Sequence, residues 1–217
     1  KVVSYDCYAQ MNPEEEGIDR YLLNLKKFGD ATRAANVPLI SIILSVGHFR
    51  YRVPSEDDIR WQLGAAVAAG SAGISWFTFY TPVRNNNYRT APIDEFDMET
   101  ETYRGMARVQ KRFHRDYGSL ITRFRYKEAF CIGKSYGGFP MFRPHSCETI
   151  RRAESAHNVP GMITYFTDKE TGKDYVMIFN NSPFEADMFR LALAPDTKVL
   201  RIQDNGNQEI DFEKEHW

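Results

Sequence analysis

The sequence has few of the residues that build metal and redox sites. It contains three cysteines, Cys7, Cys131 and Cys147, and none of them has the CxxC spacing of a zinc or redox motif. Its five histidines are scattered and form no HExxH motif. We therefore expect no metal site. An odd cysteine count leaves at least one thiol unpaired within the chain, and Cys131 with Cys147 either bridges a loop or stays reduced.

A strong charge of one sign and a long apolar run are also missing. Lys plus Arg number 28 and Asp plus Glu number 29, so the formal net charge is −1. Nucleic-acid proteins need a basic excess to neutralise phosphates, and a polybasic membrane surface needs one too. No apolar run approaches the ~20 residues that cross a bilayer. We expect no nucleic-acid partner and no membrane span.

The first residues show no targeting segment. Lys1–Tyr5 already has the pattern of a strand, and no basic region, apolar region or cleavage site precedes it. A chain that opens inside a strand is expected to be a piece of a longer polypeptide. Any localisation signal would then lie outside this sequence.

Strand and helix patterns alternate over the first half. Apolar strands are expected at 1–5, 39–46 and 73–80, with amphipathic helices after each of them. Ser55 and Asp58 form a weak capping box, Gly70 ends that helix, and Thr100 can cap the last helix. Each unit of roughly 35–45 residues matches one unit of a (β/α)8 barrel. The pattern predicts three parallel βα units, which belong either to a larger barrel or to a small open sheet.

The pattern changes near Phe124. Helical periodicity stops, and short strands with turn signals follow, including a hairpin around Asp168–Gly172 and a turn at Asp204–Gly206 that leads to a strand at 209–212. We expect a small antiparallel β-sandwich. The predicted domains are 1–124, a partial barrel, and 125–217, the sandwich.

Residues that can carry chemistry follow the predicted parallel strands, where α/β folds place their sites. Asp6 and Tyr8 end the first strand, His48 follows the second, and Trp76 and Tyr80 end the third. The loop beyond supplies Asn86, Tyr88 and Asp94. Aromatic residues make up 14% of the chain, and such rings pack in cores or cover the flat faces of sugars.

Each of these residues also has an ordinary structural interpretation. Asp6 can cap a turn, His48 can be a packing residue, and the 84–89 run can be a solvated loop. Alternation along the third strand places Trp76 and Tyr80 on one face and Phe77 on the other. We expect Phe77 to face the helices and Trp76 to point inward, toward the mouth.

Three segments resemble glycoside hydrolase family 42 and related barrel glycosidases. They are Val2–Tyr8 (VVSYDCY), Trp61–Tyr80 (WQLGAAVAAGSAGISWFTFY), and Pro92–Asp94 with Thr102–Arg104. The resemblance covers about 1–117 and implies the carboxyl-terminal part of a (β/α)8 barrel. It implies hydrolysis of O-glycosidic bonds with no cofactor, a carbohydrate substrate, and a secreted or periplasmic location.

The chain departs from that family at its catalytic carboxylates. Retaining glycosidases use an acid/base and a nucleophile, and the resemblance places the acid/base upstream of Lys1. It places the nucleophile as a Glu near the end of the 39–46 strand, where this sequence has Ser45 instead. Either the alignment with the family is shifted here, or another carboxylate such as Asp6 or Asp94 replaces the nucleophile, or the protein binds carbohydrate without cleaving it.

The resulting site prediction has one catalytic candidate and a set of sugar-binding candidates. Asp6 is the catalytic candidate. The substrate-binding candidates are Tyr8, His48, Trp76, Tyr80, Asn86, Tyr88 and Asp94. The alternatives are a non-catalytic carbohydrate-binding or scaffold protein, and a free-standing three-strand domain of unrelated function. An open edge at the first strand also predicts self-association.

Overall fold

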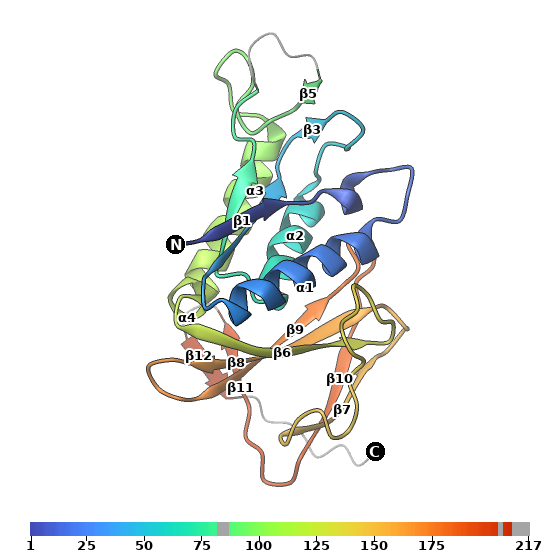
Figure 1. Cartoon of the computed structure of the whole chain (residues 1–217), viewed down its shortest axis with the longest axis vertical. Helices are drawn as coiled ribbons and strands as arrows, with labels where there is room; N and C mark the ends of the chain where they lie inside the picture. The colour runs from blue at the N-terminus through green and yellow to red at the C-terminus, as the bar shows by residue number, and fades with distance from the viewer. Residues whose placement is uncertain (82–86, 204–205, 210–217) are drawn as a thin grey trace.

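The structure, a computed structural model, describes residues 1–81, 87–203 and 206–209 (Figure 1). A parallel βαβ sheet occupies the N-terminal half, and small antiparallel sheets occupy the C-terminal half. These residues form no closed barrel. Within the same ranges, no helix is long and apolar enough to cross a membrane.

The parallel sheet confirms the predicted βα units. Its strands are β1 (Val3–Asp6), β2 (Leu39–Leu44) and β4 (Gly73–Phe77), in the order β1-β2-β4 with both pairings parallel. The order leaves β1 and β4 at the two edges, and within the described chain neither pairs with a further long strand. The strands end earlier than the apolar runs suggest, because residues beyond Leu44 and Phe77 turn into loops.

Helices connect the strands. They are η1 (Ala9–Met11), α1 (Ile18–Ala34), α2 (Glu56–Ala68), α3 (Glu101–Phe113), the π-helical turn η2 (His114–Gly118) and α4 (Ser119–Ile121). The Ser55–Asp58 capping box forms as expected, and Gly70 follows α2 with φ +86°. The Thr100 hydroxyl does not cap α3 but donates to the Ala91 carbonyl over 2.6 Å.

One face of the parallel sheet is covered and the other is not. The side chains of Leu39, Ile43 and Trp76 lie on the covered face, with the helices. Ser4, Asp6 and Ser75 are exposed on the opposite face. Parallel sheets are normally covered on both faces, so this uncovered face is unusual.

The described residues form nine further strands. They are β3 (Gly47–His48), β5 (Tyr88–Arg89), β6 (Phe124–Ile132), β7 (Ile150–Ser155), β8 (Gly161–Asp168), β9 (Asp174–Asn180), β10 (Phe189–Leu193), β11 (Leu200–Gln203) and β12 (Gly206–Glu209). They form antiparallel sheets β3-β5, β6-β8-β9, β7-β10 and β11-β12. The hairpin around Asp168–Gly172 is confirmed, with Gly172 at φ +71°. The last strand is β12, which starts three residues earlier than the predicted 209–212, and 210–212 lie outside the described residues.

The β6-β8-β9 sheet lies between the helices and the β7-β10 pair. Met162 and Phe166 of β8 pack toward the helices, whereas Ile163 and Tyr165 pack against β7 and β10. Figure 1 shows α1 and α2 between this sheet and the parallel sheet. Strand β8 is therefore buried on both faces, as its nearly uninterrupted apolar sequence requires.

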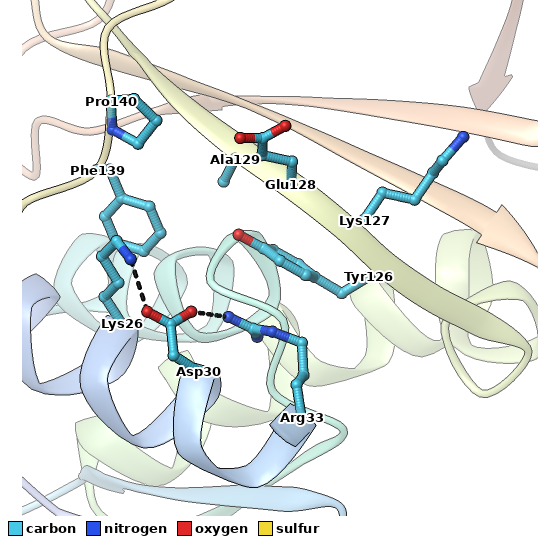
Figure 2. A pocket seen from close by; sticks show the side chains of 9 residues that line it. All are labelled: Lys26, Asp30, Arg33, Tyr126, Lys127, Glu128, Ala129, Phe139 and Pro140. Atoms are coloured by element: carbon cyan, nitrogen blue, oxygen red, sulfur yellow. Dashed lines mark hydrogen bonds and ion pairs between the residues drawn. The ribbon is translucent and has the colours of Figure 1, made fainter. Parts of the chain in front are cut away.

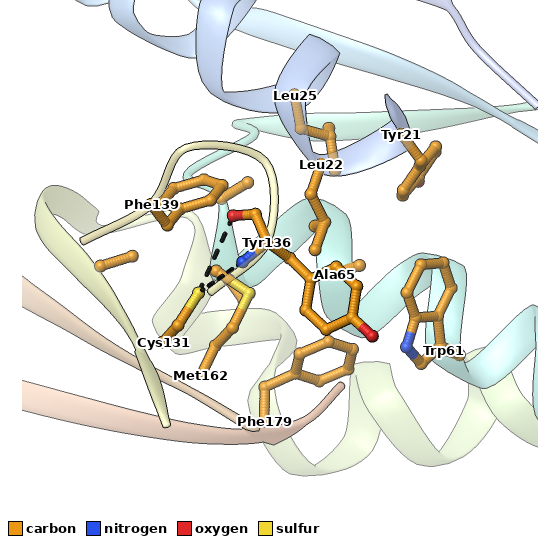
Figure 3. Close-up of a cluster of buried hydrophobic side chains, with 13 residues drawn as sticks. Tyr21, Leu22, Leu25, Trp61, Ala65, Cys131, Tyr136, Phe139, Met162 and Phe179 are labelled. Atoms are coloured by element: carbon orange, nitrogen blue, oxygen red, sulfur yellow. Dashed lines mark hydrogen bonds between the residues drawn. The ribbon is translucent and has the colours of Figure 1, made fainter. Parts of the chain in front are cut away.

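A shared buried cluster joins the two halves of the chain (Figure 3). Leu22 and Leu25 of α1 and Trp61 of α2 meet Met162 and Phe179 from the antiparallel sheet. The Thr164 hydroxyl also donates to the Ala68 carbonyl over 2.8 Å, which satisfies a buried group in this interface. The predicted boundary near residue 124 thus separates two sheet types that pack on the same helices.

The cysteines are all free. Cys131 is buried in the shared cluster, where its sulfur accepts the Tyr136 N–H over 3.4 Å. Cys147 packs on the other side of the β6-β8-β9 sheet. Of the two alternatives left by the sequence, the structure has free thiols.

Candidate functional site

The carboxyl ends of β1, β2 and β4 meet at one edge of the parallel sheet. The strand register aligns Asp6, Ile42 and Ser75 in a row on the uncovered face. Leu44 and Phe77 form the next row, and the Tyr8 ring lies beside Phe77 with centroids 5.9 Å apart. The three strand ends that the sequence analysis singled out for chemistry therefore meet at this edge.

Five rings form what we call the aromatic cluster: Tyr8, His48, Tyr51, Phe77 and Tyr88. His48 is central, because its ring centroid lies 4.7 Å from that of Tyr88 and 5.3 Å from that of Phe77. Strands β3 and β5 bring His48 and Tyr88 together as a cross-strand pair. Tyr8 and Leu44 lie in the same buried group, so the cluster caps the end of the sheet.

The surroundings of the histidine in this cluster disfavour its protonated form. Burial, and after it the nearby Arg89 guanidinium, lower the pKa of His48. Its Nδ1 atom is buried and has no hydrogen-bond partner among the described residues. A neutral imidazole can donate from one nitrogen and accept at the other, which suits a hydroxylated ligand.

Asp6 supplies the carboxylate of the site. Its side chain is exposed on the uncovered face, next to the buried Tyr8. Burial, followed by the charge of Asp6, raises the pKa of Tyr8 well above its usual range, so the phenol stays protonated. The Tyr8 hydroxyl also interacts with the Asp6 side chain. A protonated donor thus lies beside an exposed carboxylate.

The end of β2 is fixed by a buried amide. The Gln62 side chain of α2 accepts the Leu44 N–H over 2.9 Å and donates to the Leu44 carbonyl over 3.0 Å. Ser45, which occupies the position expected for a nucleophile, is fully buried and donates to the Thr78 carbonyl over 3.1 Å. Its hydroxyl serves the backbone, and no carboxylate takes its place at this strand end.

Three loop candidates have different surroundings. Tyr80 is exposed just beyond β4. Asp94 accepts the N–H groups of Phe96 and Met98, both over 2.9 Å, so its carboxylate holds a turn. Asn86 lies outside the described residues.

The expected direction of Trp76 is wrong. Trp76 packs with Ile59, Leu63 and Met106 in the helix layer, and Phe77 is the residue that joins the aromatic cluster. The alternation along the strand was correct, but its phase was reversed. Apolar side chains of α2 and α3 cover the indole, while the Phe77 ring lies beside those of Tyr8 and Tyr88.

Several exposed apolar side chains at the same edge were not singled out from the sequence. They are Phe49, Phe79, Phe96 and Met98. Phe49 is 60% exposed and Phe96 is 76% exposed, on loops that follow β2 and β4. Large apolar side chains are unusual in solvated loops. Their presence in these loop segments was the signal that the sequence offered.

A separate cavity of about 220 Å³ lies between α1 and β6 (Figure 2). At its floor Asp30 pairs with Lys26 and with Arg33, both over 2.6 Å, and the Arg33 guanidinium lies 4.1 Å from the centre of the Tyr126 ring. None of the residues predicted for the site lines it. The described residues also contain no group of three metal-ligating side chains.

Comparison of the chain with protein-family models, curated proteins and solved structures finds no match. The arrangement of the site therefore carries the functional argument by itself.

Proposed function

We propose that this chain forms the carboxyl-terminal part of a glycoside-hydrolase-like (β/α)8 protein and binds carbohydrate at the carboxyl edge of its parallel sheet. The supporting observation is the exposed Asp6 carboxylate beside the aromatic cluster. Parallel strands present their ligand sites at this edge. Sugars need both polar groups and flat apolar surfaces, and the edge offers both.

The uncovered face supports the barrel part of the proposal. In a (β/α)8 barrel, one strand face lines the interior and the helices cover the other. The helices cover one face of β1-β2-β4, and the opposite face carries Ser4, Asp6 and Ser75. Further parallel strands beside β1 and β4 would enclose that face. Residues 1–124 would then be the partial barrel, and the small sheets of 125–217 the β-sandwich that follows it.

Hydrolysis needs two carboxyl groups. At this edge Asp6 is the candidate for one of them, because Asp94 is engaged in its turn. The second would come from chain outside this sequence. Binding without hydrolysis is the second candidate function, and the observation that favours it is the buried Ser45 in the nucleophile position.

A binding and hydrolysis assay on the full chain tests both. Galactose- and glucose-containing oligosaccharides are titrated calorimetrically, and release of reducing sugar is followed in the same samples. We expect saturable binding that Asp6→Asn weakens by roughly ten- to hundredfold, the scale of a charge-assisted hydrogen bond. Asp196→Asn, a matched change at an exposed turn with φ +61°, should leave binding unchanged.

The outcomes separate the candidates. The hydrolase is supported if the chain binds sugar and releases reducing sugar, and Asp6→Asn abolishes that release. Binding without release supports a binding protein. Absence of saturable binding to every sugar, or equal weakening by both variants, contradicts the carbohydrate site.

A further inference from the structure

Among the residues that the structure describes, four cations line a groove on the far end of α3. Its volume is about 440 Å³, and the lining residues are Arg108, Lys111, Arg112 and Arg115. The spacing of three, four and seven residues places all four on one side of the helix. Thr102, Met106 and Val109 occupy the buried side, so the cationic side faces solvent.

Carboxylates orient the two outer arginines. Arg108 donates from Nε to Glu56 over 2.9 Å, and Arg115 donates from Nε to Asp116 over 2.7 Å. The Asp116 side chain is only 4% exposed, which fixes Arg115 at the wall of the groove. Their guanidinium groups are thus held at the groove, with both Nε and Nη2 of each engaged by carboxylates.

The two inner cations are less compensated. Lys111 forms no ion pair with any residue that the structure describes, and Arg112 approaches Asp116 only to 3.7 Å while 75% of its side chain is exposed. Cations in a last helical turn favour the helix dipole, and this accounts for their presence in α3. It does not account for the convergence of four cations on one groove.

We infer that this groove binds a tetrahedral oxyanion, that is, a phosphate or sulfate group. The exposed guanidinium fork of Arg112 matches such oxygens two at a time, and Lys111 adds a compact charge. A nucleic-acid strand is disfavoured, since the acidic Glu56 and Glu101 bound the patch and the whole chain has net charge −1. The site is independent of the sugar site, which lies at the carboxyl edge of the sheet.

Calorimetric titration of the full chain at low ionic strength tests this inference. The probes are inorganic phosphate, inorganic sulfate, glucose 6-phosphate and, as an uncharged control, glucose. We expect about one anion per chain and weakening of binding as NaCl is added. The double variant Lys111→Gln/Arg112→Gln should weaken anion binding at least tenfold. Glutamine has a helix propensity close to that of Lys and Arg, so α3 should persist, which circular dichroism checks.

Arg151→Gln/Arg152→Gln, a pair of exposed cations on β7, is the matched control and should bind as the wild type does. Tighter binding of glucose 6-phosphate than of phosphate would indicate a ligand that carries the anion as an ester. Equal binding of the two would indicate a free ion. Absence of saturable binding, or equal weakening by both double variants, would overturn the inference. A loss of sugar binding with intact anion binding would refute only the proposed function.

Discussion

The buried amide of Gln62 makes a strong prediction about how the end of β2 is held. Its two hydrogen bonds to Leu44 replace the strand partner that β1 no longer supplies at that level of the sheet. A third bond comes from the Gln10 side chain over 3.2 Å. Gln62→Met keeps the length of the side chain and removes its polar atoms, so the Leu44 N–H and carbonyl lose their partners without a large cavity.

The expected loss of stability follows from the number of backbone groups that lose their hydrogen-bond partners. A buried backbone group without a hydrogen-bond partner costs about 1–3 kcal/mol, and the substitution leaves two such groups without partners. We expect the free energy of unfolding to fall by about 2–6 kcal/mol, a large part of the ~5–15 kcal/mol typical of a folded chain. Gln110→Met is the control: it lies half-buried on α3, and its effect should stay within ~0.5 kcal/mol.

Urea unfolding followed by circular dichroism measures the free energy, and amide hydrogen exchange reports on Leu44 itself. The Leu44 N–H should exchange slowly in the wild type and much faster in Gln62→Met. A loss below ~1 kcal/mol, together with a Leu44 amide that stays protected, would refute this account of the strand end.

Three further changes test other parts of the structure. Gly64→Ala should destabilise the chain by ~1–3 kcal/mol in urea unfolding, because the added Cβ would lie 2.5 Å from the Phe179 ring. Adding Phe179→Leu to this variant should recover part of the lost stability. If the effects of the two substitutions are additive, the contact is contradicted. Trp76→Phe should lower the melting temperature and leave sugar affinity unchanged, since Trp76 packs in the helix layer; the reverse result would return it to the site. Burial tends to raise the pKa of Asp187, but hydrogen bonds from Ser155 and His157 outweigh it and hold that pKa below its ordinary value. The ionised Asp187 carboxylate therefore stabilises the fold fully above about pH 4, and this contribution is lost as the pH falls further. Asp187→Asn should flatten the acid side of a plot of stability against pH. An unchanged slope would contradict this.

The parallel half of the fold was predictable because its signals are local. The Ser55–Asp58 capping box and Gly70 each act within a few residues and form as expected, and the apolar run at 39–46 forms β2, which ends at Leu44. The start of α1 was less predictable. Pro13 and three acids favour a helix there, but the Asn12 side chain accepts the Glu14 N–H over 3.2 Å in a turn, and α1 begins at Ile18.

Long-range packing accounts for what the sequence could not indicate. The phase of Trp76 depends on the apolar side chains of α2 and α3 that cover β4, which alternation along one strand cannot show. Strand β7 has four polar residues among six and is recognisable only through its pairing with β10. The contact of His48 with Tyr88 joins residues forty positions apart through two-residue strands too short to have a periodic pattern.

The measurement that tests the central claim most directly is residue-resolved mapping of the sugar site. The full, isotopically labelled chain is titrated with the oligosaccharide that binds most tightly, and amide chemical shifts are followed by NMR. We predict saturable changes at Asp6, Tyr8, Phe49 and Tyr80, at the carboxyl edge of the parallel sheet. Changes confined to the cavity between α1 and β6, around Lys26 and Tyr126, or no saturable change at the carboxyl edge, would contradict it.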